Sequence, residues 1–345
     1  MKESILEIED PEMKNVRIEQ LPSGAAIPVV IRSDRPDAPL GEWVGSSKQF
    51  VDMILAKQGA ILFRGFRSQS TEEFQDLIAS LTDRLVEYKF RSTPRTKVSG
   101  RIYTSTEYPA DEWIPMHNEM AYTNAWPMKV WFYCAVAAEK GGETPIADSR
   151  VVFRAIDSAV REEFSRKGVM YARNYSPALD LPWQEVFQTT DRKEVEAYCK
   201  SNGIAFEWLE GDRLRTRQVC QAVAKHPRSG EDLWFNQAHL FHVTSLRPEV
   251  RDFLLSEFAE QDLPRNTFYG DGSAIPQDVL DHIRQVFEQT LVLFPWEVGD
   301  MMMLDNMLVA HGRAPYEGAR KIMVGMAEEV HSKDLQVLPV SPVAA

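Results

Sequence analysis

Stretches with strand-like and helix-like spacing of apolar residues alternate along the first part of the chain. Residues 26–31 (AIPVVI) and 60–63 (AILF) are short apolar runs typical of buried strands, and residues 48–57 place apolar side chains at helical spacing. Thr71 opens the segment TEEF, a capping-box pattern that predicts a helix to about Leu81. This part is therefore predicted to mix helices and strands.

The strand pattern is strongest at residues 129–137 (KVWFYCAVA), which are rich in β-branched and aromatic side chains. The GGETP that follows predicts a turn, and residues 145–147 predict a further strand. Residues 291–295 and 321–327 also predict strands, and residues 296–300 (WEVGD) predict a turn into MMMLDNMLVAH.

Four methionines gather in that run, at Met301, Met302, Met303 and Met307. They could act as soft metal ligands or fill the core of the protein. A methionine-rich strand is typical of flexible core packing, so we favour the core interpretation.

The middle of the chain, about residues 151–288, has a different pattern. Helical spacing alternates there with loops rich in Asp, Gly and Pro. The helical segments are residues 152–167, 248–261 and 276–290. Strand-rich stretches at about 60–150 and 290–330 flank this middle part, so we expect them to form one β-sandwich or barrel core whose mouth the insert covers. A mixed α+β fold in a single domain over residues 1–345 is the simplest expectation.

The composition of the chain limits the classes of partner and the cellular compartment that we expect. The 345 residues are 44% hydrophobic and carry a formal net charge of -12, which disfavours nucleic acid and anionic membranes as partners. Cys134, Cys199 and Cys220 are scattered without C-x-x-C spacing and predict neither a disulfide framework nor a zinc knuckle. The acidic start MKESILEIEDPEMK lacks an apolar signal segment, and no apolar run approaches membrane-spanning length. We therefore expect a cytoplasmic protein that acts on a small molecule.

The segment IPMHNEMAYTNAWP contains candidate metal ligands. His117 and Glu119 are one residue apart, so in an extended segment both side chains project from one face and can meet one ion. Alone, an H-x-E pair on a polar loop is more often simply solvated. A common site for iron(II) has two histidines and one carboxylate, so a second histidine is needed beside His117 and Glu119. His311 is the candidate because it ends the strand-like run LDNMLVAH beside a Gly-Arg turn.

Two further residues strengthen this interpretation. Thr144 lies in GGETPIADSR, and Arg320 follows His311 in HGRAPYEGARKIMV. An arginine on a core strand is costly to bury unless it meets a carboxylate. Its guanidinium fork suits the distal carboxylate of 2-oxoglutarate, with the threonine hydroxyl beside it.

From about Gly59 to Val330 the chain resembles the taurine dioxygenase and clavaminate synthase-like group of iron(II)/2-oxoglutarate oxygenases. The resemblance lies in an ordered set of motifs: H-x-E, G-G-E-T-P, D-N-x-x-x-x-H-G-R and a downstream arginine. It implies a double-stranded β-helix (jelly-roll) core with flanking helices, and O2 as the oxidant. It also implies that the two histidines and the carboxylate hold iron(II), and that Thr144 and Arg320 hold 2-oxoglutarate.

Glu119 bears on the reaction type. In the related halogenases a small residue replaces this carboxylate so that chloride can bind, and the resemblance therefore favours hydroxylation. Arg313 could also face the site, but Arg320 has the position that matches the family pattern.

Other residues have a substrate-binding and a structural interpretation. Asn236 and Gln237 lie in the insert, where family members commonly build a substrate lid, and we expect them to be polar substrate contacts. His239 and His242 are interpreted as structural histidines and not as extra metal ligands. Glu107 is a candidate contact for a substrate amine.

Three more residues complete the sequence-based expectations. Asp148 and Arg150 are expected to pair with each other. Tyr108, which follows Glu107, is also a candidate contact for a substrate amine. The alternative is that these two residues lie on an exposed loop.

Only the resemblance to known families indicates a class of substrate. Sulfonate-using members carry a second arginine about four residues beyond the 2-oxoglutarate arginine, where this chain has Val324. HNEMAYTNAWP, GGETPIADSR and WFNQAHLFH resemble the syringomycin-type branch, whose members hydroxylate amino acids in natural-product biosynthesis, often on a carrier protein. A dioxygenase of a small sulfonate or carboxylate in catabolism is the alternative. A metal-binding β-barrel without catalysis or with a hydrolytic zinc, and a jelly roll that only binds a partner, are the other classes.

Overall fold

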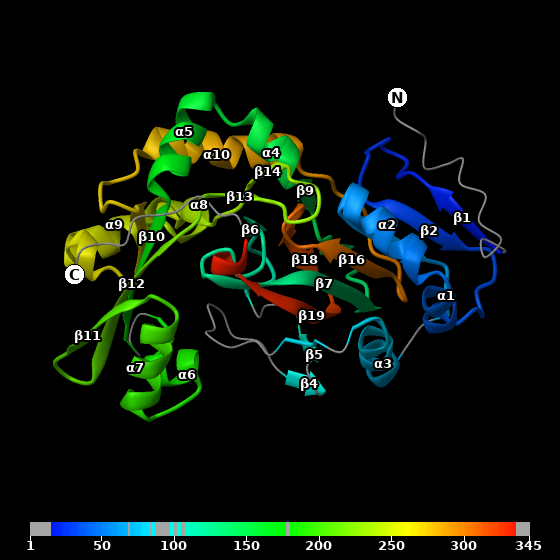
Figure 1. Cartoon of the computed structure of the whole chain (residues 1–345), viewed down its shortest axis with the longest axis horizontal. Helices are drawn as coiled ribbons and strands as arrows, with labels where there is room; N and C mark the ends of the chain where they lie inside the picture. Colours follow the sequence, from blue (N-terminus) through cyan, green and yellow to red (C-terminus); the bar gives the residue numbers. More distant parts are fainter. Residues whose placement is uncertain are drawn as a thin grey trace.

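An eight-stranded sheet joins the two strand-rich ends of the chain (Figure 1). The structure is a computed structural model that describes residues 15–67, 70–82, 84–86, 97–99, 102–104, 108–176 and 180–335. Within this part, the strands lie in the order β1 (Val16–Glu19), β2 (Val29–Ser33), β3 (Ala60–Arg64), β16 (Met301–Asp305), β7 (Ala125–Val136), β19 (Lys321–His331), β5 (Ile102–Thr104) and β4 (Lys97–Ser99). Only β2 and β3 among these described pairs run parallel. Strands from the two sequence regions therefore pair directly, as predicted.

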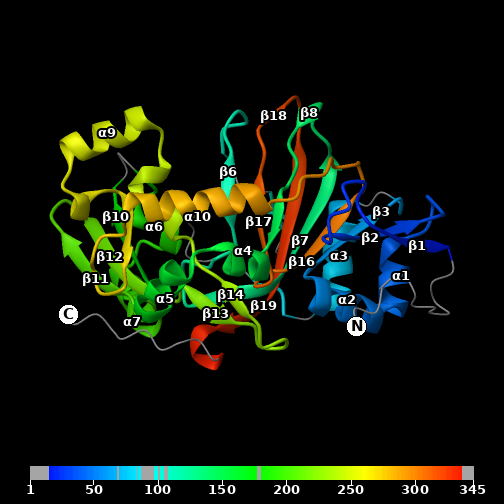
Figure 2. The same ribbon diagram turned by 90° about the horizontal axis from the view of Figure 1, so that it is seen from above.

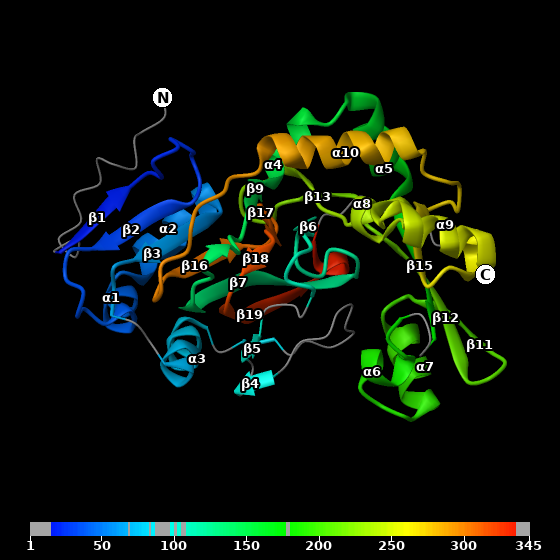
Figure 3. The same ribbon diagram turned by 180° about the vertical axis from the view of Figure 1, so that it is seen from behind.

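Alternating side chains of this sheet pack on its two sides. Helices α1 (Leu40–Ser46), α2 (Lys48–Gln58) and α3 (Thr71–Leu81) lie along one side of it (Figures 1 and 3). Met301 and Met303 join the apolar cluster that includes these helices. Met302 and Leu304 alternate with these two methionines along the strand, and they join the cluster on the opposite side. The methionines are buried, which confirms the core interpretation.

A smaller sheet packs on that opposite side. Its strands lie in the order β6 (Ile114–His117), β17 (Val309–Arg313) and β9 (Ile146–Asp148), and the two-residue strands β8 (Lys140–Gly141) and β18 (Tyr316–Glu317) pair beside it (Figure 2). Ile146 and Val309 of the small sheet share an apolar cluster with Val130 and Met302 of the large sheet. The core is thus a two-layer arrangement of facing sheets, with the small sheet between the large sheet and the middle part of the chain.

The middle part of the chain contains strands that the sequence pattern did not predict. A four-stranded sheet has the order β11 (Ala205–Leu209), β12 (Arg213–Cys220), β10 (Val169–Tyr175) and β15 (Arg265–Tyr269), and β13 (Val223–Lys225) pairs with β14 (Asp232–Trp234). The sequence pattern indicated helices and loops in this mixed insert and did not identify these strands. In β12 the buried positions Leu214, Thr216, Gln218 and Cys220 alternate with three arginines and Val219; two of the buried positions are polar, so the apolar signal is too weak to reveal the strand.

The middle part of the chain also contains helices (Figures 1 and 2). They are α4 (Ser149–Ala155), α5 (Ser158–Lys167), α6 (Trp183–Phe187), α7 (Arg192–Ser201), α8 (Ala238–Phe241), α9 (Pro248–Glu257) and α10 (Gln277–Thr290), with the 3-10 turns η3 (Val243–Ser245) and η4 (Glu260–Asp262); a third 3-10 turn, η5 (Ser332–Asp334), follows later in the chain. Of these helices, α4, α8 and α10 contact strands of the small sheet. Among the described residues, none of these helices combines the length and apolar character that a membrane crossing requires.

Several predicted boundaries need correction. The helix expected over 152–167 is two helices, because the chain turns extended at Ile156 before α5 begins. The helix expected over 248–261 ends at Glu257, and a 3-10 turn follows. The strand expected over 291–295 reduces to one bridge between Val292 and Ile146.

The capping box of α3 begins one residue before the predicted position. Ser70 is the N-cap: its hydroxyl accepts the Glu73 backbone N–H, and the Glu73 carboxylate accepts the Ser70 N–H in return. Thr71 is the first helical residue, and the helix ends at Leu81 as predicted.

Candidate functional site

Two histidines face each other across neighbouring strands of the small sheet. His117, the last residue of β6, is the register partner of His311 in β17. Residues directly opposite in an antiparallel pair project to the same side of the sheet. The two imidazole rings accordingly lie with their centroids 4.6 Å apart.

Glu119 joins them from just beyond the end of β6. Its backbone N–H donates to Oδ1 of Asn306 at 2.7 Å, and its carbonyl accepts from Nδ2 of Asn306 at 2.9 Å. Asn118 adds a hydrogen bond from its own amide to the Asn306 carbonyl at 2.7 Å. Met120, the next residue, has a positive φ of 59°. The same-face argument held only for an extended segment, and β6 ends at His117; a turn that Asn306 holds places Glu119 beside the histidines.

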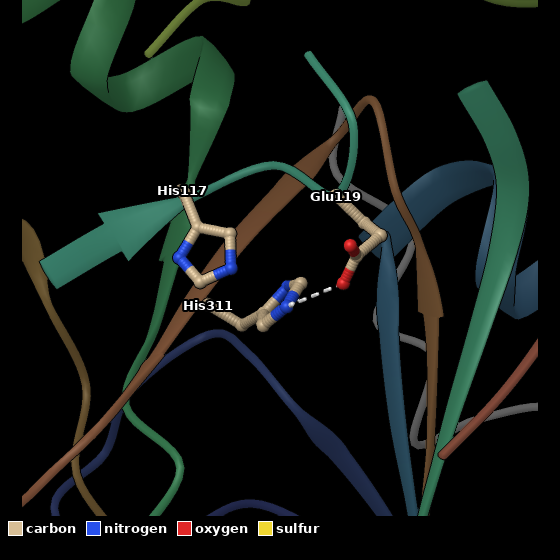
Figure 4. Close-up of side chains that lie close together, drawn as sticks. All are labelled: His117, Glu119 and His311. Atoms are coloured by element: carbon tan, nitrogen blue, oxygen red, sulfur yellow. Dashed lines mark ion pairs between the residues drawn. The ribbon is translucent and has the colours of Figure 1, made fainter. Parts of the chain in front are cut away.

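The three side chains converge on one point (Figure 4). One ligand atom from each of His117, Glu119 and His311 lies within 4.8 Å of the other two, and Nε2 of His311 is 3.8 Å from Oε2 of Glu119. Glu119 and His311 are 3% and 4% exposed. Two imidazoles and one carboxylate are a donor set that suits iron(II) and leaves coordination positions open, so these residues fit such an ion.

A backbone carbonyl fixes the orientation of the His117 ring. Its Nδ1 lies 2.8 Å from the carbonyl oxygen of Pro115, a distance at which Nδ1–H donates to the carbonyl. The lone pair of the neutral ring is then on Nε2, which is the atom available to a metal ion. Phe132 packs edge-on against the other ring, that of His311, with centroids 5.0 Å apart.

Thr144 and Arg320 lie next to each other. Nη2 of Arg320 is 3.4 Å from the Thr144 hydroxyl, which also accepts the indole N–H of Trp296 at 3.1 Å. Thr144 is two residues before Ile146, the register partner of His311. Burial and the nearby Arg313 lower the pKa of Arg320 to about 10, so its guanidinium is cationic at neutral pH. A cation and a hydroxyl thus lie together at the strand beside His311.

Gly142 allows Arg320 to take this position. Nε of Arg320 donates to the Gly142 carbonyl at 2.8 Å. Gly142 has a φ of +74°, and a Cβ there would lie 3.0 Å from the Arg320 Cδ and 3.1 Å from its Nε. A side chain at this position would therefore both strain the backbone and push the arginine.

Arg313 contacts a different part of the molecule. Its guanidinium donates to the carbonyls of Tyr108 at 2.9 Å and Glu112 at 2.8 Å, and also to the carbonyl of Pro109. It lies 5.2 Å from the centroid of the Tyr316 ring. Arg313 thus fastens the segment before β6 to β17, and it is absent from the described lining of the cavity below.

A cavity of about 790 Å³ opens from the metal-ligand candidates toward the insert. Its described lining includes His117, Glu119 and Gln237, together with apolar residues of the insert. Tyr108 lines it as well, whereas Glu107 lies outside the described residues. A cavity of this volume can hold a drug-sized molecule.

Asn236 and Gln237 do not share a role. The Asn236 amide donates to the Ala222 carbonyl at 2.8 Å and accepts the Ala238 N–H at 3.0 Å, and its side chain is buried without being part of the described cavity lining. The expectation that Asn236 contacts substrate is therefore corrected: backbone groups of Ala222 and Ala238 use both ends of the amide. Gln237 lines the cavity, and its Nε2 donates to the Asn118 carbonyl at 2.7 Å.

His239 and His242 are outside the metal cluster of the described residues, as expected. Nε2 of His239 lies 3.0 Å from the Met116 carbonyl, and burial lowers the pKa of His239 to about 3. Nδ1 of His242 lies 2.9 Å from the Thr244 hydroxyl, and burial lowers the pKa of His242 to about 4. Both rings are neutral at neutral pH.

Asp148 and Arg150 pair as predicted. Nη2 of Arg150 donates to Oδ2 of Asp148 at 2.8 Å, and the same carboxylate caps α4 by accepting the Arg150 N–H.

Sequence reasoning did not assign a role to Asn306, Asp180, Arg265 or Tyr122, although all four lie in or beside this site. Asn306 is part of the D-N-x-x-x-x-H-G-R motif, so a signal for it was present. Asp180 and Arg265 are 85 residues apart and pair only in the folded chain, so no local pattern could identify them.

Comparisons with known proteins agree on one group. The family described as taurine catabolism dioxygenase TauD, TfdA family matches residues 21–327. The dapdiamide synthesis protein DdaC of Enterobacter agglomerans is 43% identical over 92% of this chain and 95% of its own length. A clavaminate synthase-like protein of Arabidopsis thaliana is 29% identical over 89% of this chain and 92% of its own.

Solved structures share the fold. PvcB, described as an iron, alpha-ketoglutarate (2-oxoglutarate) dependent oxygenase from an isonitrile synthetic pathway and known from Pseudomonas aeruginosa, superimposes with a TM-score of 0.56. The identity is 15%, over 94% of this chain and 96% of PvcB. AAD-2, solved with Mn(II) and N-oxalylglycine, gives a TM-score of 0.51 at 14% identity over 90% of this chain and 97% of AAD-2.

Proposed function

Because this chain belongs to the TauD, TfdA family of iron(II)- and 2-oxoglutarate-dependent dioxygenases, we propose that it hydroxylates an unactivated C–H bond of an amino acid or amino-acid derivative. Iron, 2-oxoglutarate and O2 are its cofactor and co-substrates. The proposal assigns His117, Glu119 and His311 as the iron ligands. The observation that carries it is the convergence of their ligand atoms within 4.8 Å of one another, with His117 and Glu119 in the lining of the cavity.

Arg320 and Thr144 are proposed to hold 2-oxoglutarate. A guanidinium fork and a hydroxyl 3.4 Å apart match the two oxygens of a distal carboxylate. Loss of solvation lowers the pKa of Arg320, and a bound carboxylate would offset that loss. This pairing would fix the co-substrate in one orientation beside His311.

Bound iron and 2-oxoglutarate would supply the oxidising chemistry, in which 2-oxoglutarate loses CO2, one oxygen atom of O2 enters succinate and the other enters the substrate. The protein supplies orientation and a dry site. Asn306 holds the backbone of Glu119, Pro115 holds His117, and the apolar walls of the cavity exclude water from the reacting C–H bond.

The facing sheets are proposed to be the two halves of a double-stranded β-helix in one domain over residues 1–345. The insert, about residues 151–288, is proposed to be the lid over the substrate. Support comes from the cavity, whose described lining joins His117 and Glu119 of the core with Gln237 and Phe241 of the insert.

The substrate class is supported by the dapdiamide synthesis relative, whose name places it in natural-product biosynthesis. An amino-acid-derived substrate, free or presented on a carrier protein, fits that context. A small sulfonate or carboxylate of catabolism is the second candidate. Against a sulfonate, Val324 is a buried core residue at the position where sulfonate-using members carry a second arginine.

Succinate formation is the experiment that tests the proposed reaction. Protein reconstituted with iron(II) under anaerobic conditions is supplied with 2-oxoglutarate, O2 and candidate amino acids. We expect succinate release that rises when an amino-acid substrate is present, with a hydroxylated product of equal amount. Succinate release that no amino acid or derivative stimulates, but a small sulfonate does, would favour the second candidate.

A further inference from the structure

A histidine of the insert is buried against the turn that connects β16 to β17. His226 follows β13 at the start of the β13–β14 hairpin (Figure 2), and its side chain is 0% exposed. Its Nε2 lies 3.1 Å from Oδ2 of Asp305, the last residue of β16. The two residues are 79 positions apart in the sequence. This pair therefore joins the insert to the core.

The hairpin determines which ring nitrogen of His226 carries the hydrogen. The Ser229 backbone N–H donates to Nδ1 of His226 at 3.1 Å, so Nδ1 is an acceptor and has no hydrogen of its own. Nε2 then carries the ring hydrogen and donates it to the Asp305 carboxylate. Backbone hydrogen bonds from Gly230 to His226 at 2.8 Å and from His226 to Glu231 at 2.9 Å close the same turn. The donor thus has one fixed orientation.

The Asp305 carboxylate in turn holds the backbone that follows β16. Its Oδ1 accepts the N–H groups of Met307 at 3.0 Å and Leu308 at 3.2 Å, while its Oδ2 accepts from His226. Both oxygens of this buried carboxylate therefore have donors. Removal of the imidazole would take a donor from a buried acceptor, which is costly, and would free the carboxylate to rotate.

The same turn presents Asn306 to the backbone of Glu119. Asn306 follows Asp305 directly, and its amide accepts the Glu119 N–H at 2.7 Å and donates to the Glu119 carbonyl at 2.9 Å. Its own carbonyl accepts from the Asn118 amide at 2.7 Å. From His226 to Glu119, each step is a hydrogen bond or a peptide bond between residues that are at most 3% exposed. A fully satisfied network of this kind holds its members in one arrangement.

We infer that His226 is a positioning residue for the proposed iron ligand Glu119. By holding the Asp305 carboxylate, it fixes the turn whose next residue, Asn306, sets the backbone of Glu119. The inference rests on the proposed function, because it concerns the proposed iron site. Groups that orient metal ligands without touching the metal change metal affinity when they are removed. The insert thus contributes to the geometry of the iron site as well as to the wall of the cavity.

Two variants of His226 separate the two hydrogen bonds of its ring. His226→Gln places an amide N–H near the position of Nε2, so it still donates to Asp305 but loses the acceptor for the Ser229 N–H. His226→Asn places an amide oxygen near the position of Nδ1, so it still accepts that N–H but is too short to reach Asp305. A positioning role therefore tolerates Gln, whereas a role in the hairpin alone tolerates Asn.

Iron affinity is the quantity to measure. Each protein is titrated with iron(II) in excess 2-oxoglutarate without O2, and the visible absorption band of the iron/2-oxoglutarate complex gives the apparent Kd for iron. We expect His226→Asn to raise this Kd roughly 10-fold and His226→Gln to keep it within about twofold of the wild type. Circular dichroism and thermal unfolding check that each variant is folded at the temperature of the titration.

Glu231→Gln is the matched control on the same hairpin. It removes an ion pair in which Nη1 of Arg150 lies 3.2 Å from Oε2 of Glu231, whose side chain is 43% exposed. This pair does not touch Asp305, so the variant should keep the wild-type Kd for iron. A Kd raised as much as in His226→Asn would show that the hairpin as a whole, and not the imidazole, affects the iron site.

Asp305→Asn breaks the same contact from the other side. One end of an amide is a donor, so it cannot accept both the His226 N–H and the N–H groups of Met307 and Leu308. This variant should raise the Kd for iron at least as much as His226→Asn, and it replaces that variant if the latter fails to fold.

Three results would overturn the inference. They are a wild-type Kd in folded His226→Asn, a wild-type Kd in folded Asp305→Asn, and a Kd that His226→Gln and His226→Asn raise equally. A purely structural histidine would give the first result together with a lowered unfolding temperature. The wild type separates the two claims: if it forms the band and His226→Asn forms it equally well, only the inference fails, whereas absence of the band in the wild type contradicts the proposed function itself.

Discussion

Arg320 and Arg313 both come from the segment HGRAPYEGAR, yet their guanidinium groups contact different parts of the molecule. Arg320 lies at the Thr144 hydroxyl, whereas Arg313 binds backbone carbonyls of the segment before β6. We predict that Arg320→Gln raises the KM for 2-oxoglutarate roughly 10- to 100-fold, which corresponds to a charge-assisted pair of about 1.5–3 kcal/mol. The KM for the prime substrate should change little. Steady-state kinetics with each substrate varied in turn measures both.

Arg313→Gln is the matched control for that variant. It removes hydrogen bonds to the Tyr108 and Glu112 carbonyls and should lower stability with little effect on the KM for 2-oxoglutarate. If the KM for 2-oxoglutarate rose with Arg313→Gln and stayed constant with Arg320→Gln, the assignment of the two arginines would be reversed.

Gln237 and Asn236 give a second matched pair. Gln237 lines the cavity, so Gln237→Ala should raise the KM for the prime substrate while the visible band of the iron/2-oxoglutarate complex persists. Asn236→Ala should instead destabilise the fold by about 1–3 kcal/mol, because it removes two buried hydrogen bonds and leaves the Ala238 N–H without the acceptor that Asn236 provides. Thermal unfolding and succinate kinetics on both variants distinguish the roles. Loss of the band in Gln237→Ala would place this residue with the co-substrate.

The metal-ligand candidates could be predicted from the sequence, whereas the different roles of Asn236 and Gln237 could not. The motifs pointed to His117, Glu119 and His311, and the fold does bring them together. Pattern and spacing could not tell that the Asn236 amide bonds to backbone groups of Ala222 and Ala238 while Gln237 lines the cavity. That difference depends on which backbone groups the amide meets, and these are set by the tertiary fold.

A buried ion pair joins Arg64, the last residue of β3, to Asp300, the residue before β16. Nε and Nη2 of Arg64 donate to the Asp300 carboxylate at 3.0 and 2.5 Å, and Arg64 also donates to the Pro295 carbonyl. Asp300 is 1% exposed. We predict that Arg64→Met lowers the free energy of unfolding by about 3–5 kcal/mol, because it leaves an uncompensated buried carboxylate. Denaturant unfolding measures this.

Arg67→Met is the control for that variant. Arg67 pairs with Glu73 at 2.7 Å, but both side chains are largely exposed, at 52% and 42%. Exposed pairs contribute about 0–1 kcal/mol, so this change should have little effect. If the two variants lowered the free energy of unfolding equally, burial of the Arg64–Asp300 pair would not be the cause of the destabilisation.

Elements with a strong apolar pattern could be predicted, and those with a polar one could not. The strand at 129–137 and the helices at 48–57 and 276–290 carry their signal locally, and the structure contains them close to the predicted bounds. Strand β12 of the four-stranded sheet was missed because arginines alternate there with buried positions, two of which, Thr216 and Gln218, are polar. The bridge at Val292 forms with Ile146 across the molecule, a contact that the sequence near Val292 cannot specify.

The molecule as a whole brings together two sequence regions that are far apart. His117 and Glu119 come from the first strand-rich region and His311 from the second, and they meet because β6 pairs with β17. The insert between them adds the far wall of the cavity, including Asp180 and Arg265. The resemblance indicated both the core and the lid region, but only the folded chain defines which insert residues reach the cavity.

Iron content is the most direct measure of whether these three residues form the iron site. Wild-type protein, His311→Ala and His331→Ala are loaded with iron(II) under anaerobic conditions, passed through a desalting column and assayed for bound iron, with circular dichroism as a check of the fold. His331 is the matched control, since it lies at the exposed end of β19 outside the cluster. We predict stoichiometric iron in the wild type and in His331→Ala, and almost none in a folded His311→Ala. Stoichiometric iron in His311→Ala, bound with wild-type affinity, would contradict the assignment.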